Sequence, residues 1–138
     1  MTHADSDSVS SMLADVDTAV HVTREDLAAF LSRDDYIILI AEDDRIAGYL
    51  CFMLIPPEAE LLDIAVDRSF RRKGVARTLL NEGIRLLRTR GITKLFLEVA
   101  VTNTAARTFY GTHDFTENGL RKNYYGNTID AVLMSRII

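Results

Sequence analysis

Between residues 60 and 110 the spacing of apolar residues changes from strand-like to helical and back again, which limits the folds open to the chain. Residues 60–66 predict a strand, residues 75–90 a helix, and residues 94–101 a second strand. Gly91 is placed to end the helix, and residues 103–110 predict another short one. A strand, a helix and a strand in this order favour a right-handed crossover, which sets the two strands parallel.

Antiparallel hairpins are expected on both sides of this unit. Residues 36–41 and 46–55 read as strands joined by a turn at 42–44, and Pro56-Pro57 ends the second. Residues 115–125 and 128–137 flank Gly126-Asn127, a pair that tolerates positive φ in a hairpin turn. Residues 9–20 and 23–32 predict two short helices. We therefore expect an α/β (α+β) fold with a mixed sheet flanked by helices.

Length and composition fit one domain over residues 1–138, in which 48 % of residues are hydrophobic and 26 % charged. Cys51 is the single cysteine and cannot form an internal disulfide, which favours a reducing, cytoplasmic setting. Cys51 and three scattered histidines supply too few ligands for a metal site, so we expect no metal. No apolar run approaches the roughly 18 residues of a membrane span, and no signal peptide is expected.

Charge is divided unevenly between the two halves of the chain. Residues 1–67 hold 3 Lys and Arg against 15 Asp and Glu, whereas residues 68–138 hold 13 against 5. The net charge of −4 argues against a nucleic-acid partner. The basic second half instead favours phosphate on a small molecule.

The basic segment 71–77 joins the predicted strand to the predicted helix, where unpaired amides and the helix dipole favour an anion. Gly74 would let the backbone approach a pyrophosphate, and Ala76 would leave the next turn unobstructed. A basic loop that merely ends in glycine explains these residues equally well. The members of this candidate phosphate cradle are Arg71, Arg72, Lys73, Gly74, Val75, Ala76 and Arg77.

Several segments in order resemble the GNAT family of acyl-CoA-dependent N-acyltransferases. They are Leu62-Asp63-Ile64-Ala65-Val66-Asp67, Arg71-x-x-Gly74-x-Ala76, Leu97-Glu98-Val99, Asn103-x-x-Ala106 and Phe109-Tyr110. The resemblance spans residues 36–138. It is greatest to the RimI-type protein N-terminal (ribosomal-protein-alanine) acetyltransferases, whose tract before the last hairpin resembles residues 121–125.

The resemblance implies that acetyl-CoA binds between two splayed strands. Residues 71–76 would hold its diphosphate through backbone amides, with Arg77 adding positive charge, and the strand edge at Ile64, Ala65 and Val66 would pair with its pantetheine arm. Asn103 and Ala106 belong to the same cofactor site. From sequence alone, capping of the short helix is the favoured role of Asn103.

Glu98 and Tyr110 are the candidate catalytic residues. Strand alternation puts Glu98 on the face opposite Leu97 and Val99, and an acid in mid-strand is costly unless it is paired or used. By resemblance, Glu98 is the general base for the acceptor ammonium. Tyr110 would be the acid for the leaving thiolate, since a phenol with a pKa of about 10 keeps its proton at neutral pH.

Asp63, Tyr124 and Tyr125 are the candidates for contact with the acceptor. Transfer to a protein N-terminal amine by direct attack in a ternary complex is the first hypothesis. A small-molecule amine or polyamine acceptor is an alternative, because residues 1–35 form a short, divergent front region. A non-catalytic acyl-CoA-binding or protein-interaction module is another alternative, because His113-Asp114 replaces the family's usual pattern after the tyrosine. No membrane partner is expected, and the protein is a monomer or a homodimer.

Overall fold

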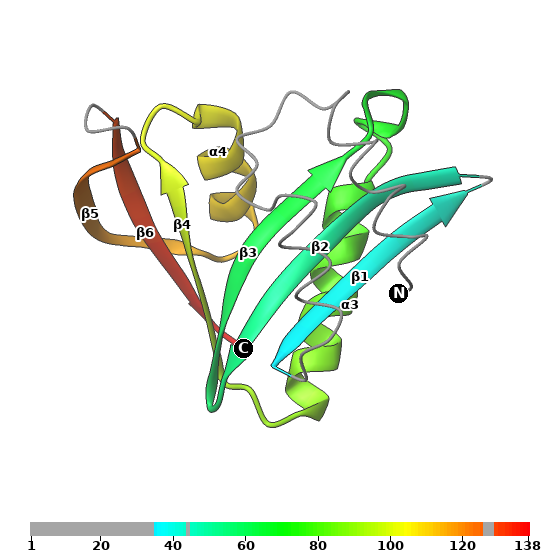
Figure 1. Cartoon of the computed structure of the whole chain (residues 1–138), viewed down its shortest axis with the longest axis horizontal. Helices are drawn as coiled ribbons and strands as arrows, with labels where there is room; N and C mark the ends of the chain where they lie inside the picture. The colour runs from blue at the N-terminus through cyan, green and yellow to red at the C-terminus, as the bar shows by residue number, and fades with distance from the viewer. Residues whose placement is uncertain (1–34, 44, 126–128) are drawn as a thin grey trace.

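The computed structural model is built around a mixed β-sheet, with two helices on one face of it (Figure 1). It describes residues 35–43, 45–125 and 129–138, so the helices expected at 9–20 and 23–32 lie outside the described residues. Over the described residues the strand order is β1-β2-β3-β4-β6-β5. The strands are β1 (Tyr36–Asp43), β2 (Arg45–Ile55), β3 (Glu58–Val66), β4 (Lys94–Ala100), β5 (Thr116–Tyr125) and β6 (Ile129–Ile137). The helices are η1 (Arg68–Phe70), α3 (Val75–Thr89) and α4 (Thr104–Thr112).

This arrangement confirms the expected fold class and both hairpins. β1 pairs with β2 and β5 with β6, in each case antiparallel, while β3 and β4 are parallel. The turn expected at 42–44 was wrong in part, because Glu42 and Asp43 still pair with β2 beyond a bulge after Ala41. The turn at Gly126-Asn127 lies outside the described residues.

The parallel pair is short, and its two strands then separate. β3 and β4 are paired only from Glu58 opposite Lys94 to Glu60 opposite Phe96. Beyond that point β3 stays with β2 as far as Val66, and β4 stays with β6 as far as Ala100. Each strand follows its antiparallel neighbour, so the sheet opens into a V (Figure 1).

A bulge in β3 accompanies this separation. Cys51 of β2 lies opposite Asp63 and Phe52 lies opposite Leu61, so Leu62 is the extra residue. The bulge reverses the alternation of side chains along the strand. Leu61 and Ile64 consequently face the helices, whereas Leu62 and Ala65 belong to a smaller cluster with Tyr49 and Cys51.

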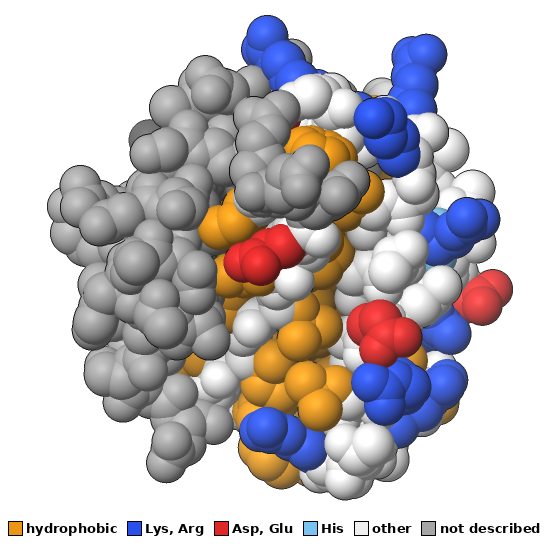
Figure 2. Space-filling view, turned by 90° about the vertical axis from the view of Figure 1, so that its right-hand side faces the viewer, with side chains coloured by type: hydrophobic (Ala, Val, Ile, Leu, Met, Phe, Trp, Pro, Cys, Tyr) orange, Lys and Arg blue, Asp and Glu red, His pale blue; other side chains and the backbone are white. Residues whose placement is uncertain are grey.

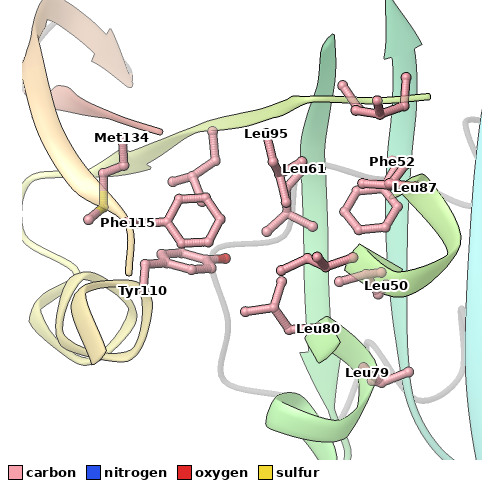
Figure 3. Close-up of a cluster of buried hydrophobic side chains, with 14 of the residues drawn as sticks. Leu50, Phe52, Leu61, Leu79, Leu80, Leu87, Leu95, Tyr110, Phe115 and Met134 are labelled. Carbon is pink, nitrogen blue, oxygen red and sulfur yellow. The ribbon is translucent and has the colours of Figure 1, made fainter. Parts of the chain in front are cut away.

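The main core lies between the sheet and the two helices. Apolar residues of α3 pack on β2, β3 and β4, and residues of α4 and β6 extend the same cluster (Figure 3). Its members from α3 are Leu79, Leu80, Ile84 and Leu87, which recur at helical spacing as expected. None of the described helices is long and apolar enough to cross a membrane.

Gly83 brings α3 close to the sheet. A Cβ atom built there would lie 2.7 Å from Phe52 Cε2 and 2.9 Å from Leu50 Cδ2. Both neighbours are fully buried, so neither side chain has room to withdraw.

We predict that Gly83→Ala lowers the free energy of unfolding by about 1–3 kcal/mol, because overpacking outweighs the helix propensity that alanine adds. Urea denaturation measures this change. Gly111→Ala in α4 is the matched control, since nothing lies within 4 Å of its Cβ position. That control should be neutral or stabilise by up to about 1 kcal/mol. A stabilised Gly83→Ala protein would contradict the close approach.

Candidate active site

The V between β3 and β4 opens a cleft of about 910 Å³, a volume typical of ligand sites. Its walls come from both strands, from α4 and from the loop before α3. Because β3 and β4 are unpaired here, their facing backbone edges are available to a ligand. Their lining residues are Leu61, Leu62, Asp63, Ile64, Ala65 and Val66 from β3 and Leu97, Glu98, Val99 and Ala100 from β4.

The loop between β3 and α3 has the features of an anion-binding turn and adjoins one end of this cleft. Arg72 and Gly74 have positive φ angles of 63° and 78°. The first hydrogen bond of the helix runs from Thr78 N to Gly74 O at 3.0 Å, so amides 75–77 precede the helical ladder. Figure 2 shows Lys and Arg side chains projecting at the end of the molecule where this loop lies. Backbone donors and positive charge therefore coincide here.

The structure divides the expected cofactor residues into two groups. Ile64, Ala65, Val66, Arg71, Ala76, Asn103 and Ala106 line the cleft. The remaining five, Arg72, Lys73, Gly74, Val75 and Arg77, belong to the adjoining turn and first helical turn rather than to the lining. Together the two groups suit an elongated ligand with phosphate at one end and amide groups along its arm.

Asn103 caps α4. Its side-chain oxygen accepts a hydrogen bond from Ala106 N at 3.1 Å, while the residue also lines the cleft. Of its two candidate roles, the structure shows the helix cap.

Glu98 projects from mid-strand β4 into the cleft, on the face opposite the helices. Its side chain is 19 % exposed, and Arg121 Nη1 of β5 lies 3.0 Å from Oε1. The expectation of a partly buried carboxylate is thus confirmed, and its charge is paired.

Tyr110 lies on the other side of the same cleft. Phe109 and Phe115 hold its ring, with centroids 5.5 Å from it in both cases. Figure 3 shows the hydroxyl pointing away from α4, toward the side of β3. Glu98 and Tyr110, twelve positions apart in the sequence, therefore line one cleft.

Asp114 does not disturb the end of α4. It adopts a left-handed φ of 68°, and the amides of His113 and Phe115 both donate to Tyr110 O, at 3.0 and 3.1 Å. Arg136 Nη1 donates to His113 O at 3.1 Å and so fastens the turn to β6. Asp114 thus occupies the position that glycine usually takes after a helix.

Asp63 is buried at the bulge and has internal partners. It accepts hydrogen bonds from Tyr49 Oη at 2.6 Å and from Ile64 N at 2.9 Å. Burial, followed by the charge of Asp63, raises the pKa of Cys51 to about 12, so this thiol stays protonated at neutral pH. The single cysteine is therefore no nucleophile for covalent transfer.

Sequence reasoning missed Arg121 as the partner of Glu98 and Tyr49 as the partner of Asp63. Strand alternation could have placed both on the correct face, but their pairing depends on the strand order. The side chains of Tyr124 and Tyr125 lie outside the described part of the chain. Among the described residues, no group of three or more His, Cys, Asp or Glu could hold a metal ion.

Comparison with known proteins agrees with this geometry. The model of the Acetyltransferase (GNAT) family matches residues 7–115. The [ribosomal protein bS18]-alanine N-acetyltransferase of Salmonella typhimurium is 39 % identical over 99 residues, which cover 70 % of this chain and 67 % of that protein.

Two crystal structures of similar proteins extend the comparison. The ribosomal-protein-S18-alanine N-acetyltransferase from Escherichia coli has a TM-score of 0.88 and 27 % identity, covering all of this chain and 90 % of the other. The ribosomal-protein-alanine N-acetyltransferase from Brucella melitensis has a TM-score of 0.84 and 25 % identity, covering 100 % and 97 %. Fold, cleft and sequence agree, and the chain belongs to the GNAT family as an N-acetyltransferase that uses acetyl-CoA.

Proposed function

We propose that this enzyme transfers an acetyl group from acetyl-CoA to the N-terminal α-amine of a protein. The observation that carries the proposal is the presence of Glu98 and Tyr110 in the lining of one cleft beside an anion-binding turn. The relatives named for alanine N-acetylation of a ribosomal protein support this acceptor class.

The donor fits the two groups of cofactor residues. The amides of residues 75–77, with Arg71, Arg72, Lys73 and Arg77, would hold the diphosphate. The free edge of β3 at Ile64, Ala65 and Val66 would pair with the amides of the pantetheine arm, in the manner of an added strand. Bound acetyl-CoA supplies a thioester, whose carbonyl carbon is open to attack by an amine.

Glu98 would act as general base. An amine attacks only after losing its proton, and the carboxylate can take that proton directly or through water. Tyr110 would donate a proton to the sulfur that leaves. With Cys51 buried and protonated, transfer proceeds by direct attack in a ternary complex rather than through an acyl-enzyme.

Asp63 and the strand that ends at Tyr125 would border the acceptor, although Tyr49 already holds the Asp63 carboxylate. Asp63 therefore contributes more to the shape of the bulge than to direct acceptor binding. Tyr124 and Tyr125 remain candidates for acceptor contact. A cytoplasmic location and a single domain over residues 1–138 remain predictions, as does a monomeric or homodimeric state.

We predict that Glu98→Gln lowers kcat by about 10²–10⁴-fold, because the proton acceptor is lost. The acid limb of the pH–rate profile should disappear with the carboxylate, while calorimetry finds acetyl-CoA affinity nearly unchanged. Tyr110→Phe should also lower kcat without loss of donor binding. An unchanged pH profile in Glu98→Gln would remove Glu98 from the mechanism.

The acceptor class is tested with a panel of peptides beginning with alanine, serine or methionine, together with polyamines, analysed by mass spectrometry. We expect acetylation at the α-amine of a peptide, with unprotonated amine as the reacting form. Turnover of small amines but of no peptide would favour the small-molecule alternative instead.

We predict that Gly74→Glu weakens acetyl-CoA binding by at least about tenfold, through backbone strain at φ 78° and a negative charge beside the phosphates. Gly91→Glu is the matched control, because Gly91 has a φ of 77° at the other end of α3. Calorimetry should show full donor affinity in the control. Equal affinities in the two variants would mean that the phosphate site lies elsewhere.

A further inference from the structure

Glu60 is a charged residue for which the proposed reaction has no role so far. It occupies the last position at which β3 pairs with β4, opposite Phe96, and Met53 of β2 lies opposite it on the other side. It is half-buried between these two apolar residues. A carboxylate in such surroundings is costly unless something compensates for it.

Glu60 lies on the same face of the sheet as Glu98 and Arg121. Glu60 and Phe96 are register partners, and Glu98 follows Phe96 by two residues on β4. From β4 the pairing continues from Ala100 to Ala131 and then to Arg121, so the guanidinium approaches Glu98 from the other side. Glu60 therefore stands where the cleft begins, and Glu98 just inside it.

The guanidinium of Arg121 pairs with Glu98, the carboxylate nearest to Glu60 on β4. Arg121 Nη1 lies 3.0 Å from Oε1 and 3.2 Å from Oε2 of Glu98. Burial raises the pKa of Glu60, the neighbouring Glu98 raises it further, and Arg121 lowers it. Glu60, Glu98 and Arg121 therefore form one cluster of charges on this face.

Among the residues that the structure describes, the other ionisable groups on this face have partners of their own or lie on strands farther from β4. Glu58 of β3 has Lys94 of β4 at 4.0 Å, and Asp63 is held by Tyr49 of β2 beside Cys51. From β1, Tyr36 lies opposite Met53. Apart from Arg121, the described neighbours on this face of β5 and β6 are neutral, such as Ser135, whose Oγ donates to Asn118 Oδ1 at 2.6 Å.

A cation paired with a carboxylate favours the charged form of that carboxylate and so weakens it as a base. A second carboxylate nearby repels the negative charge of the first and opposes this effect. We propose that Glu60 is a positioning residue that acts through Glu98: its negative charge beside Glu98 opposes the effect of Arg121, so that Glu98 remains able to accept the proton of the acceptor amine. This role rests on the proposed function of Glu98.

The kinetic test compares pH–rate profiles of kcat/KM, using acetyl-CoA and a peptide acceptor turned over by the wild-type enzyme. In Glu60→Gln we expect the acid limb to move to lower pH by about 0.5–1 unit, because the repelling charge is gone. The plateau should fall about two- to fivefold, as expected for a weaker base. Arg121→Met should move the limb in the opposite direction.

The matched control is Glu58→Gln, which makes the same change of charge on the same face of β3 at the closed end of the strand pair. The acid limb of the pH–rate profile of this variant should coincide with that of the wild type. Glu60→Asp should restore the position of the limb in large part. A merely structural role of Glu60 would lower the plateau and leave the limb in place, and that result would overturn the proposal.

A second measurement needs no activity. Carbon-13 NMR follows the titration of the Glu60 carboxyl group in the wild-type protein and in Glu98→Gln, where we expect its midpoint to fall by about 0.5–1 pH unit. Coupling between two titrating groups is reciprocal, so this shift reports the effect of Glu60 on Glu98. If the titration midpoint of Glu60 is the same in Glu98→Gln as in the wild type, the proposed interaction between Glu60 and Glu98 is overturned, whatever the acceptor proves to be.

The two measurements separate the possible failures. If the Glu60 midpoint moves but the Glu60→Gln rate profile does not, Glu98 is not the proton acceptor, and the proposed role of Glu60 falls with it. Should the wild type acetylate no peptide, the proposed acceptor fails, and the kinetic arm is run with whichever small amine the panel identifies. A shift of both the midpoint and the limb supports the proposal.

Discussion

The separation of β3 from β4 is the feature on which the rest of the site depends. Each of these strands is held over its whole length by an antiparallel neighbour, but the two are held to each other only at their first residues. Beyond Glu60, the backbone groups of β3 and β4 that face each other form no ladder hydrogen bonds across the gap. A ligand that buried these groups without forming hydrogen bonds to them would pay a free-energy penalty. An arm that carries its own amides can complete both edges. The cleft is thus a place where the sheet itself requires a partner of peptide-like chemistry.

The ends of the cleft differ in charge, and the difference suits a reaction between an anionic donor and a cationic acceptor. At one end, the turn before α3 combines a helix terminus with basic residues. On the sheet face opposite the helices, Glu60 and Glu98 flank the point where the strands part. Arg121 of β5 pairs with Glu98, so the charge beside the proposed base depends on the geometry of β5.

Packing of aromatic side chains fixes the position of Tyr110, the second candidate catalytic residue. Tyr110 is held by two aromatic rings, and the helix that carries it ends in a turn fastened by Arg136. The aspartate at the left-handed position is tolerated because short polar side chains visit that conformation at moderate cost and because neighbouring groups supply the hydrogen bonds. On the other wall, the bulge at Leu62 turns Asp63 toward Tyr49 and leaves Ile64 on the helical face. The candidate site residues are thereby placed by the core and by strand register rather than by loops.

Local patterns in the sequence determined the strands, the helix at 75–89 with its end at Gly91, the basic turn, and the half-buried position of Glu98, because each depends on residues close together along the chain. The tertiary structure alone decided where the strands part, which side chains meet across the sheet, and which polar groups share a charge. Arg121 reaches Glu98 only because β6 lies between β4 and β5, and Tyr49 reaches Asp63 only through the register of β2 at the bulge. Pairings of this kind depend on strand order and register, which neither the spacing of apolar residues nor local charge encodes.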